Sequence, residues 1–167
     1  MDRRRLLALV ASLAFPWTAA AQPASPQPQQ PMFSEADAAA ARATIDRYFA
    51  AFSVRDYPAF RQVFTVPYLM GGRALETLPT LDAVMQRYLA VRERLDKADY
   101  ASSKAAEVRL TPLGDVSALA NVHWQRFKKD GSLLNEGAEI LLLAKVDGAW
   151  KLTGVLPEDL RAFAAAR

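Results

Sequence analysis

The 167-residue sequence contains no cysteine and a single histidine, His123. Without cysteine the chain forms no disulfide, so its stability must come from a packed core. Zinc sites draw mainly on several histidine and cysteine ligands, so we expect no zinc site. A calcium-binding D-x-[DN]-x-[DN]-G loop, a phosphate-binding glycine loop and a dinucleotide fingerprint are also missing. A carboxylate-only metal site stays open, but we expect neither a metal nor a cofactor.

The sequence also lacks a long apolar run near its amino terminus, where Leu6 to Phe15 falls far short of the roughly 20 residues of a membrane-spanning helix. A basic cluster at 3–5 precedes this run, and the small residues Ala19 and Ala21 follow it. This order is typical of a secretory signal peptide over residues 1–21. We therefore expect a periplasmic or secreted protein without a stable membrane anchor, exported by the Sec or the twin-arginine route. An uncleaved anchor is the alternative.

The net charge of the chain is also small once the signal peptide is set aside. Removing residues 1–21 takes away three arginines and one aspartate, which lowers the net charge from +3 to +1. We therefore expect no nucleic-acid partner. Residues 22–32 are rich in proline and glutamine, as in an extended linker. The remainder suffices for one domain over 33–156 and a carboxy-terminal helix over 157–167.

Helical patterns occupy the first part of this domain. Ser34 and Asp37 form a capping box before apolar residues at helical spacing, which predicts a helix ending near Val54. The segment 57–64 predicts a second helix, ended by Pro67. A tight hairpin turn is predicted at 71–72 from its two glycines. A third helix is then predicted from its Thr80 cap, fading in the charged stretch 92–99.

Strand patterns follow at 101–110, 116–127, 138–146 and 150–156. Asp-Gly pairs at 130–131 and 147–148 separate the last three segments, which predicts an antiparallel meander. Pro157 is expected to open the terminal helix. Helices followed by an antiparallel sheet predict an α+β fold with the helices packed on one face of the sheet.

Two segments carry a family resemblance: "IDRYFAAFSVRDYPAFRQVF" at 45–64 and "VDGAWKL" at 146–152. In this order they resemble the nuclear transport factor 2-like superfamily, the SnoaL-like and ketosteroid-isomerase-like cone. The resemblance covers about residues 33–156. It implies a strongly curved, mostly antiparallel sheet covered by helices, and it makes a homodimer the expected assembly.

The resemblance does not imply one activity, because this fold hosts enzymes, binding modules and dimerising adaptors. Tyr48 resembles the oxyanion-binding tyrosine of ketosteroid isomerases. The hairpin "YLMGGRA" lacks their catalytic carboxylate, and the late strand "ILLLA" lacks their second acid. We therefore assign no catalytic residue.

Candidate ligand-binding residues come from the helices and the strands. Alternation along 116–127 puts Trp124 and Arg126 on the more apolar strand face and His123 on the other. We expect the apolar face to meet the helices, which leaves His123 outside and Arg126 able to grip a carboxylate. Glu139 either contributes to the pocket or forms a cross-strand ion pair. The candidate set is Tyr48, Tyr68, Tyr88, Trp124, Arg126 and Glu139.

Three functions remain open at this level. We favour an exported domain that binds a small, mostly apolar molecule in the pocket of the cone. The second is an acid-base enzyme with His123 or Glu139 as the base and Tyr48 or Tyr68 as a hydrogen-bond donor. The third is a dimerising interaction module that uses the outer face of the sheet.

Overall fold

The computed structural model describes residues 33–165. The predicted signal peptide and linker lie outside this part of the chain. The described elements, in chain order, are α1 (Glu35–Val54), α2 (Tyr57–Gln62), β1 (Phe64–Met70), β2 (Glu76–Leu78), α3 (Leu81–Asp96), β3 (Tyr100–Pro112), β4 (Ser117–Lys128), β5 (Leu133–Val146), β6 (Ala149–Glu158) and α4 (Leu160–Ala165). No helix within residues 33–165 combines the length and the apolar character needed to cross a membrane.

The first helix begins at the predicted capping box. The Asp37 amide donates a 3.1 Å hydrogen bond to Ser34 Oγ, and the Ser34 amide donates to the Asp37 carboxylate. Each bond satisfies a backbone donor that the helix start would otherwise leave free. The helix ends where Arg55 adopts a left-handed conformation with φ of 61°. The predicted cap of α3 is also confirmed, since the Ala83 amide donates to Thr80 Oγ1.

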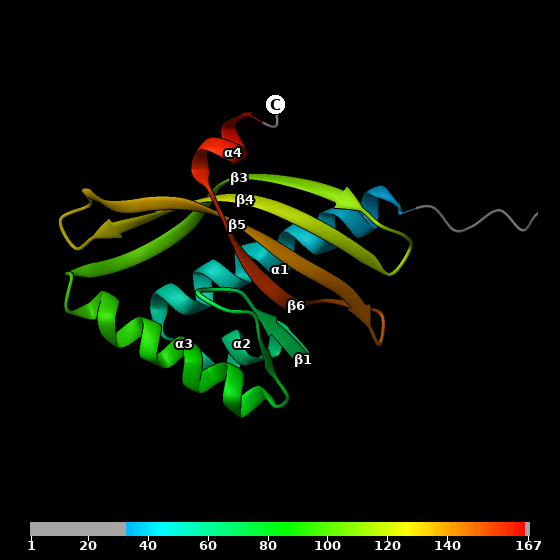
Figure 1. The fold of residues 1–167 in the computed structure, drawn as a ribbon, viewed down its shortest axis with the longest axis horizontal. Coiled ribbons are helices and arrows are strands. Elements are labelled where there is room, and N and C mark those ends of the chain that lie inside the picture. The colour runs from blue at the N-terminus through cyan, green and yellow to red at the C-terminus, as the bar shows by residue number, and fades with distance from the viewer. Residues whose placement is uncertain (1–32, 166–167) are drawn as a thin grey trace, which may run out of the picture.

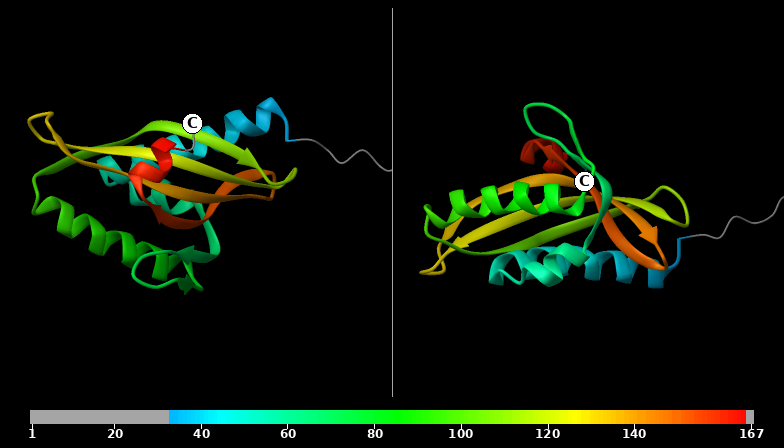
Figure 2. Two further views of the ribbon diagram at one scale, coloured as in Figure 1. Left: turned by 45° about the horizontal axis from the view of Figure 1, so that its top comes forward. Right: turned by 90° about the horizontal axis from the view of Figure 1, so that it is seen from below.

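All six strands form one sheet in the order β2-β1-β6-β5-β4-β3. Strands β3 to β6 form the predicted antiparallel meander, whereas β1 runs parallel to β6. The long strands curve around α1, with α3 and the short hairpin on the same side and α4 on the opposite side (Figure 1). The two rotated views in Figure 2 show the same curved sheet and its helical cover. The predicted α+β cone is therefore confirmed, but the prediction that all helices pack on one face is wrong for α4, whose Phe163 packs against the outward-facing His123.

The core lies between α1, α3 and the inner face of the sheet. On β4, the side chains of Ala118, Ala120 and Val122 are fully buried in this core. The predicted orientation of β4 is therefore confirmed, because the residues that alternate with Leu119 and His123 face the helices.

The region around Pro67 differs from the sequence prediction. The second helix ends at Gln62, and Phe64 already belongs to β1, which continues through Pro67. The apolar spacing of residues 57–64 fitted a helix through Phe64. Phe64 instead pairs with Leu152 of β6, and this strand pairing ends the helix earlier.

The hairpin after β1 also differs, because its loop spans residues 71–75 and neither glycine has a positive φ. Gly71 is needed for close packing instead, since a Cβ there would lie 2.7 Å from Pro157 Cδ. Pro157 itself lies within β6 and does not open the terminal helix. Strand β5 extends far enough to pair Ala138 with Glu158, so β6 continues and α4 starts only at Leu160.

Candidate functional site

A small cavity of about 30 Å³ lies inside the cone, between α1, α3 and strands β3 to β5. Its lining is aromatic, with a few polar groups: Tyr48, Phe49, Phe52, Tyr88, Val91, Ser103, Trp124, Arg126 and Glu139. Five of the six predicted ligand-binding residues therefore share one cavity. Tyr68 is the exception, because it lies behind the lining in the core.

Three buried tyrosine hydroxyls form a short chain beside this cavity. Tyr48 Oη donates a 3.4 Å hydrogen bond to Tyr88 Oη, which lies 2.9 Å from Tyr68 Oη. Burial raises the pKa of all three phenols, and the negative charge of Glu139 raises the pKa further. The hydroxyls therefore stay neutral at physiological pH and can donate hydrogen bonds to a ligand. Helical spacing in α1 and α3 placed Tyr48 and Tyr88 on the inner face, and the β1 pleat placed Tyr68.

Glu139 contributes the only carboxylate of the cavity lining. Its side chain is partly buried, but Oε1 is fully buried and has no hydrogen-bond partner. Burial raises its pKa to about 7, an effect that the positive charge of Arg126 opposes. The alternative of a cross-strand ion pair is wrong: Glu139 lies opposite Val122, whereas Arg126 lies opposite Asn135. The sequence alternation placed Glu139 inside, but its lack of a partner required the tertiary structure.

Arg126 and Trp124 form a stacked pair on the β4 side of the cavity. The guanidinium carbon lies 4.1 Å from the Trp124 ring centroid. The Arg126 side chain forms no ion pair or hydrogen bond with any residue in 33–165, although its backbone belongs to the β4 ladder. The indole lies flat over β5 because Gly137 faces it; a Cβ at Gly137 would lie 2.5 Å from Trp124 Cζ2. Cation-π stacking therefore holds the Arg126 guanidinium beside the cavity. Because this guanidinium has no ion-pair partner within residues 33–165, it can bind an anionic ligand.

His123 lies on the outer face of the sheet and does not reach the cavity. Its Nε2 is 3.0 Å from Glu136 Oε2, and its ring contacts Phe163 of α4. Hydrogen bonds from Gln125 and His123 lower the pKa of Glu136. The acid-base role considered for His123 is therefore wrong, because β4 alternation directs it away from the cone.

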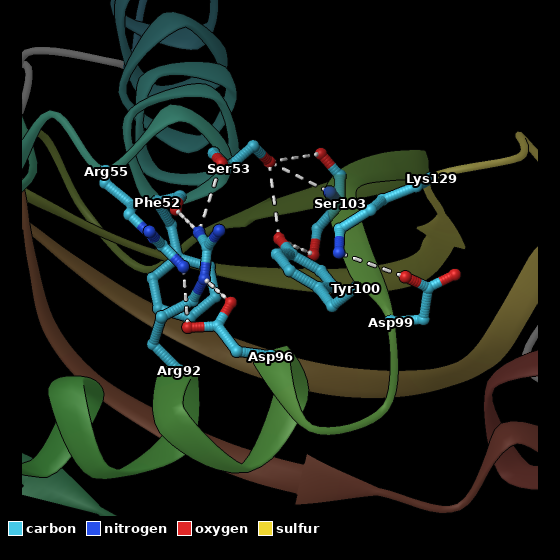
Figure 3. A network of polar contacts seen from close by, with 9 residues as sticks. All are labelled: Phe52, Ser53, Arg55, Arg92, Asp96, Asp99, Tyr100, Ser103 and Lys129. Atoms are coloured by element: carbon cyan, nitrogen blue, oxygen red, sulfur yellow. Dashed lines mark hydrogen bonds and ion pairs between the residues drawn. The ribbon is translucent and has the colours of Figure 1, made fainter.

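A second, wider cavity of about 350 Å³ opens at the end of α1, and Figure 3 shows its polar network. Buried Arg92 donates to the carbonyl oxygens of Phe52 and Ser53 and to Asp96. Arg55 also pairs with Asp96. The charges of this network are thus matched within the protein, and the Arg92 side chain closes the α1 C-terminus.

A serine connects the two cavities. Ser103 lines the cone cavity, its Oγ lies 2.7 Å from Tyr100 Oη, and its amide donates to Ser53 Oγ. Sequence reasoning missed Ser103 and Arg92. The signal for Arg92 was its helical spacing from Tyr88 and Leu95, which puts a cation on the apolar face of α3. Within residues 33–165 no group of three or more acidic or histidine side chains could hold a metal ion.

Comparison with known proteins places this geometry in a family context. A family profile described as NTF2-like protein (DUF6841) matches residues 35–160. None of the curated proteins matches the chain significantly. Among solved structures, a protein of unknown function with a cystatin-like fold from Nostoc punctiforme is similar at 12% identity and a TM-score of 0.64, over 77% of this chain and 94% of that one.

Two further solved structures show the same fold. An NTF2-like protein with a cystatin-like fold from Novosphingobium aromaticivorans has 19% identity and a TM-score of 0.62, over 79% of this chain and 87% of that one. A ketosteroid isomerase-like protein from Erwinia carotovora atroseptica has 19% identity and a TM-score of 0.57, over 76% and 98%. At such identities the likeness shows the shared fold.

Proposed function

The chain belongs to the NTF2-like family DUF6841, and from this premise we propose that its cone cavity binds a small, mostly apolar molecule. The observation that carries the proposal is the unpartnered Oε1 of Glu139, buried in an aromatic lining. A buried polar atom without a partner costs about 1–3 kcal/mol. A ligand that offers Glu139 a hydrogen bond removes this cost, whereas the apolar lining supplies the remaining binding energy. The signal-peptide pattern in residues 1–21 supports placing this activity in an exported protein.

The cavity must enlarge to hold such a ligand. A volume of about 30 Å³ is far below the roughly 300 Å³ at which ligand pockets begin. The walls from α1 and α3 are core residues, so they resist displacement, whereas Trp124 and Arg126 are only partly buried. Small shifts of these two side chains, with Arg126 still lining the cavity, are therefore the movements that make room.

An acid-base enzyme is the second candidate function, and Glu139 favours it. A general base works best when its pKa lies near the working pH, and the pKa of Glu139 is about 7. Tyr48 and Tyr88 would donate hydrogen bonds to a developing negative charge. Glu139 replaces His123 as the base in this scheme, because His123 faces outward.

Native mass spectrometry of the protein from its own host tests the binding proposal. We expect extra mass on the protomer that disappears under denaturing conditions. Val91→Phe fills the cavity and should reduce the occupied fraction at least tenfold. Val116→Phe makes the same change at an exposed position and should leave the occupancy unchanged. A wild-type protein without extra mass, or equal occupancy in both variants, contradicts the proposal.

An enzyme would convert its ligand and release it, so turnover distinguishes the two candidates. If the bound molecule is recovered chemically unchanged after incubation with the protein, binding alone is supported. If it is converted, Glu139→Gln should lower kcat by at least a hundredfold, because the general base is lost. Conversion that continues unchanged in this variant rules out Glu139 as the base.

A further inference from the structure

The cavity presents two polar groups of opposite character that do not satisfy each other. The Arg126 guanidinium stacks on Trp124 and forms no ion pair within the described residues. The Glu139 Oε1 atom is buried and has no hydrogen-bond partner. Both belong to the lining of the same cavity. A ligand that bridges them satisfies both groups at once.

The charge of the bridging group can be derived from the groups that face Glu139. Arg126 faces it from β4, and the neutral phenols of Tyr48 and Tyr88 face it from α1 and α3, with the neutral phenol of Tyr68 on β1 behind them. An ammonium group would pair with Glu139 but would be repelled by Arg126. A carboxylate binds a guanidinium through two parallel hydrogen bonds and accepts further hydrogen bonds from neutral donors.

We propose that the ligand is a small hydrophobic carboxylate, which Arg126 binds as an ion pair while protonated Glu139 donates a hydrogen bond to the same carboxylate. The inference rests on the proposed function, since it names the class of molecule that the cavity binds. The aromatic lining contacts the apolar part of the ligand, and the phenol of Tyr48 or Tyr88 can donate a second neutral hydrogen bond.

The proton on Glu139 makes binding depend on pH. Two ionised carboxylates in contact would repel each other, so the complex requires the neutral form of Glu139. Burial raises the pKa of Glu139 to about 7 in the free protein. Binding therefore takes up about half a proton at pH 7 and close to one proton at pH 8, and only above about pH 8 does the affinity fall about tenfold for each further pH unit. Between pH 6 and pH 7 the affinity falls only about twofold.

Isothermal titration calorimetry with three matched probes tests the inference. Phenylacetate is the carboxylate, phenylacetamide its neutral counterpart and phenethylamine its cationic counterpart. At pH 6.5 we expect phenylacetate to bind at least tenfold tighter than either counterpart, and at pH 8 about fivefold weaker than at pH 7. In buffers of different ionisation enthalpy, binding at pH 8 should take up close to one proton.

Two variants assign these effects to residues. Arg126→Gln should abolish the preference for phenylacetate over phenylacetamide, whereas Arg47→Gln changes an exposed arginine of α1 and should leave it intact. Glu139→Gln stays neutral and keeps a donor, so its affinity for phenylacetate should not change between pH 6 and pH 8. If Arg126→Gln does not fold, Arg126→Lys replaces it and should lose at least part of the preference, because the two-point contact is lost.

The outcomes separate the inference from the proposed function. If phenylacetamide or phenethylamine binds as tightly as phenylacetate, the cavity binds small molecules but the carboxylate class is wrong. A preference for phenylacetate without proton uptake overturns the role of Glu139. If none of the three probes binds although native mass spectrometry shows a bound molecule, this inference is overturned and the proposed binding function stands; if neither experiment shows binding, both are rejected.

Discussion

Replacing Glu139 with glutamine should stabilise the protein above neutral pH. In the folded protein burial raises the pKa of Glu139 from 4.5 to about 7. The folded state therefore keeps its proton at pH values where the unfolded chain has lost it. The free energy of unfolding must then fall as the pH rises from about 4.5 to 7, and the loss is complete above 7.

The size of the loss follows from the two pKa values. At 1.36 kcal/mol for each pKa unit, the full shift corresponds to about 3 kcal/mol. The Glu139 side chain is only partly buried, so solvent screening reduces this figure. We expect Glu139→Gln to raise the free energy of unfolding by about 1–3 kcal/mol at pH 8 and by less than about 1 kcal/mol at pH 5.

Urea denaturation at pH 5 and pH 8, followed by circular dichroism, measures both values. Glu136→Gln is the matched control, because Glu136 is also a carboxylate of β5 but faces outward. Hydrogen bonds lower the pKa of Glu136, so its ionised form stabilises the fold above its ordinary pKa. This control should therefore lose stability at pH 8. A Glu139→Gln variant with the same stability change at both pH values would refute the burial argument.

Four further substitutions are tested by the same denaturation measurement. Arg92→Met should lower the free energy of unfolding by about 2–4 kcal/mol, because two carbonyl oxygens at the end of α1 lose their buried donor. Gly137→Ala should lower it by about 1–3 kcal/mol and change the tryptophan fluorescence, since the added Cβ collides with Trp124. Ser34→Ala should cost about 0.5–2 kcal/mol through the lost cap. His123→Ala should change it by less than about 1 kcal/mol and leave phenylacetate binding intact; a loss of binding would place His123 in the site.

Local sequence signals predicted much of the fold. The capping box at Ser34 and the Thr80 cap fixed the starts of α1 and α3, because a cap depends only on neighbouring residues. The turn at 147–148 was likewise predictable, and both residues adopt positive φ. Alternation along β4 predicted which face meets the helices, since side chains of a strand point to opposite faces in turn.

The sequence predicted less where distant segments decide the structure. Phe64 and Pro67 lie in β1 because this segment pairs with β6, about 90 residues further along the chain. A glycine is needed at position 71 because a Cβ there would collide with Pro157. A rule based on local turn residues cannot predict this contact between distant segments. The end of β6 depends in the same way on the length of β5.

The candidate site divides along the same line. The sequence by itself determined which residue types face the cone, because periodicity assigns Tyr48 and Tyr88 to helix faces and Trp124, Arg126 and Glu139 to strand faces. Only the tertiary structure decided that these residues share one cavity, and that Glu139 lacks a partner. The physical reason is that burial and unpaired charge depend on strand register and on curvature of the sheet, which bring together side chains from five separate elements.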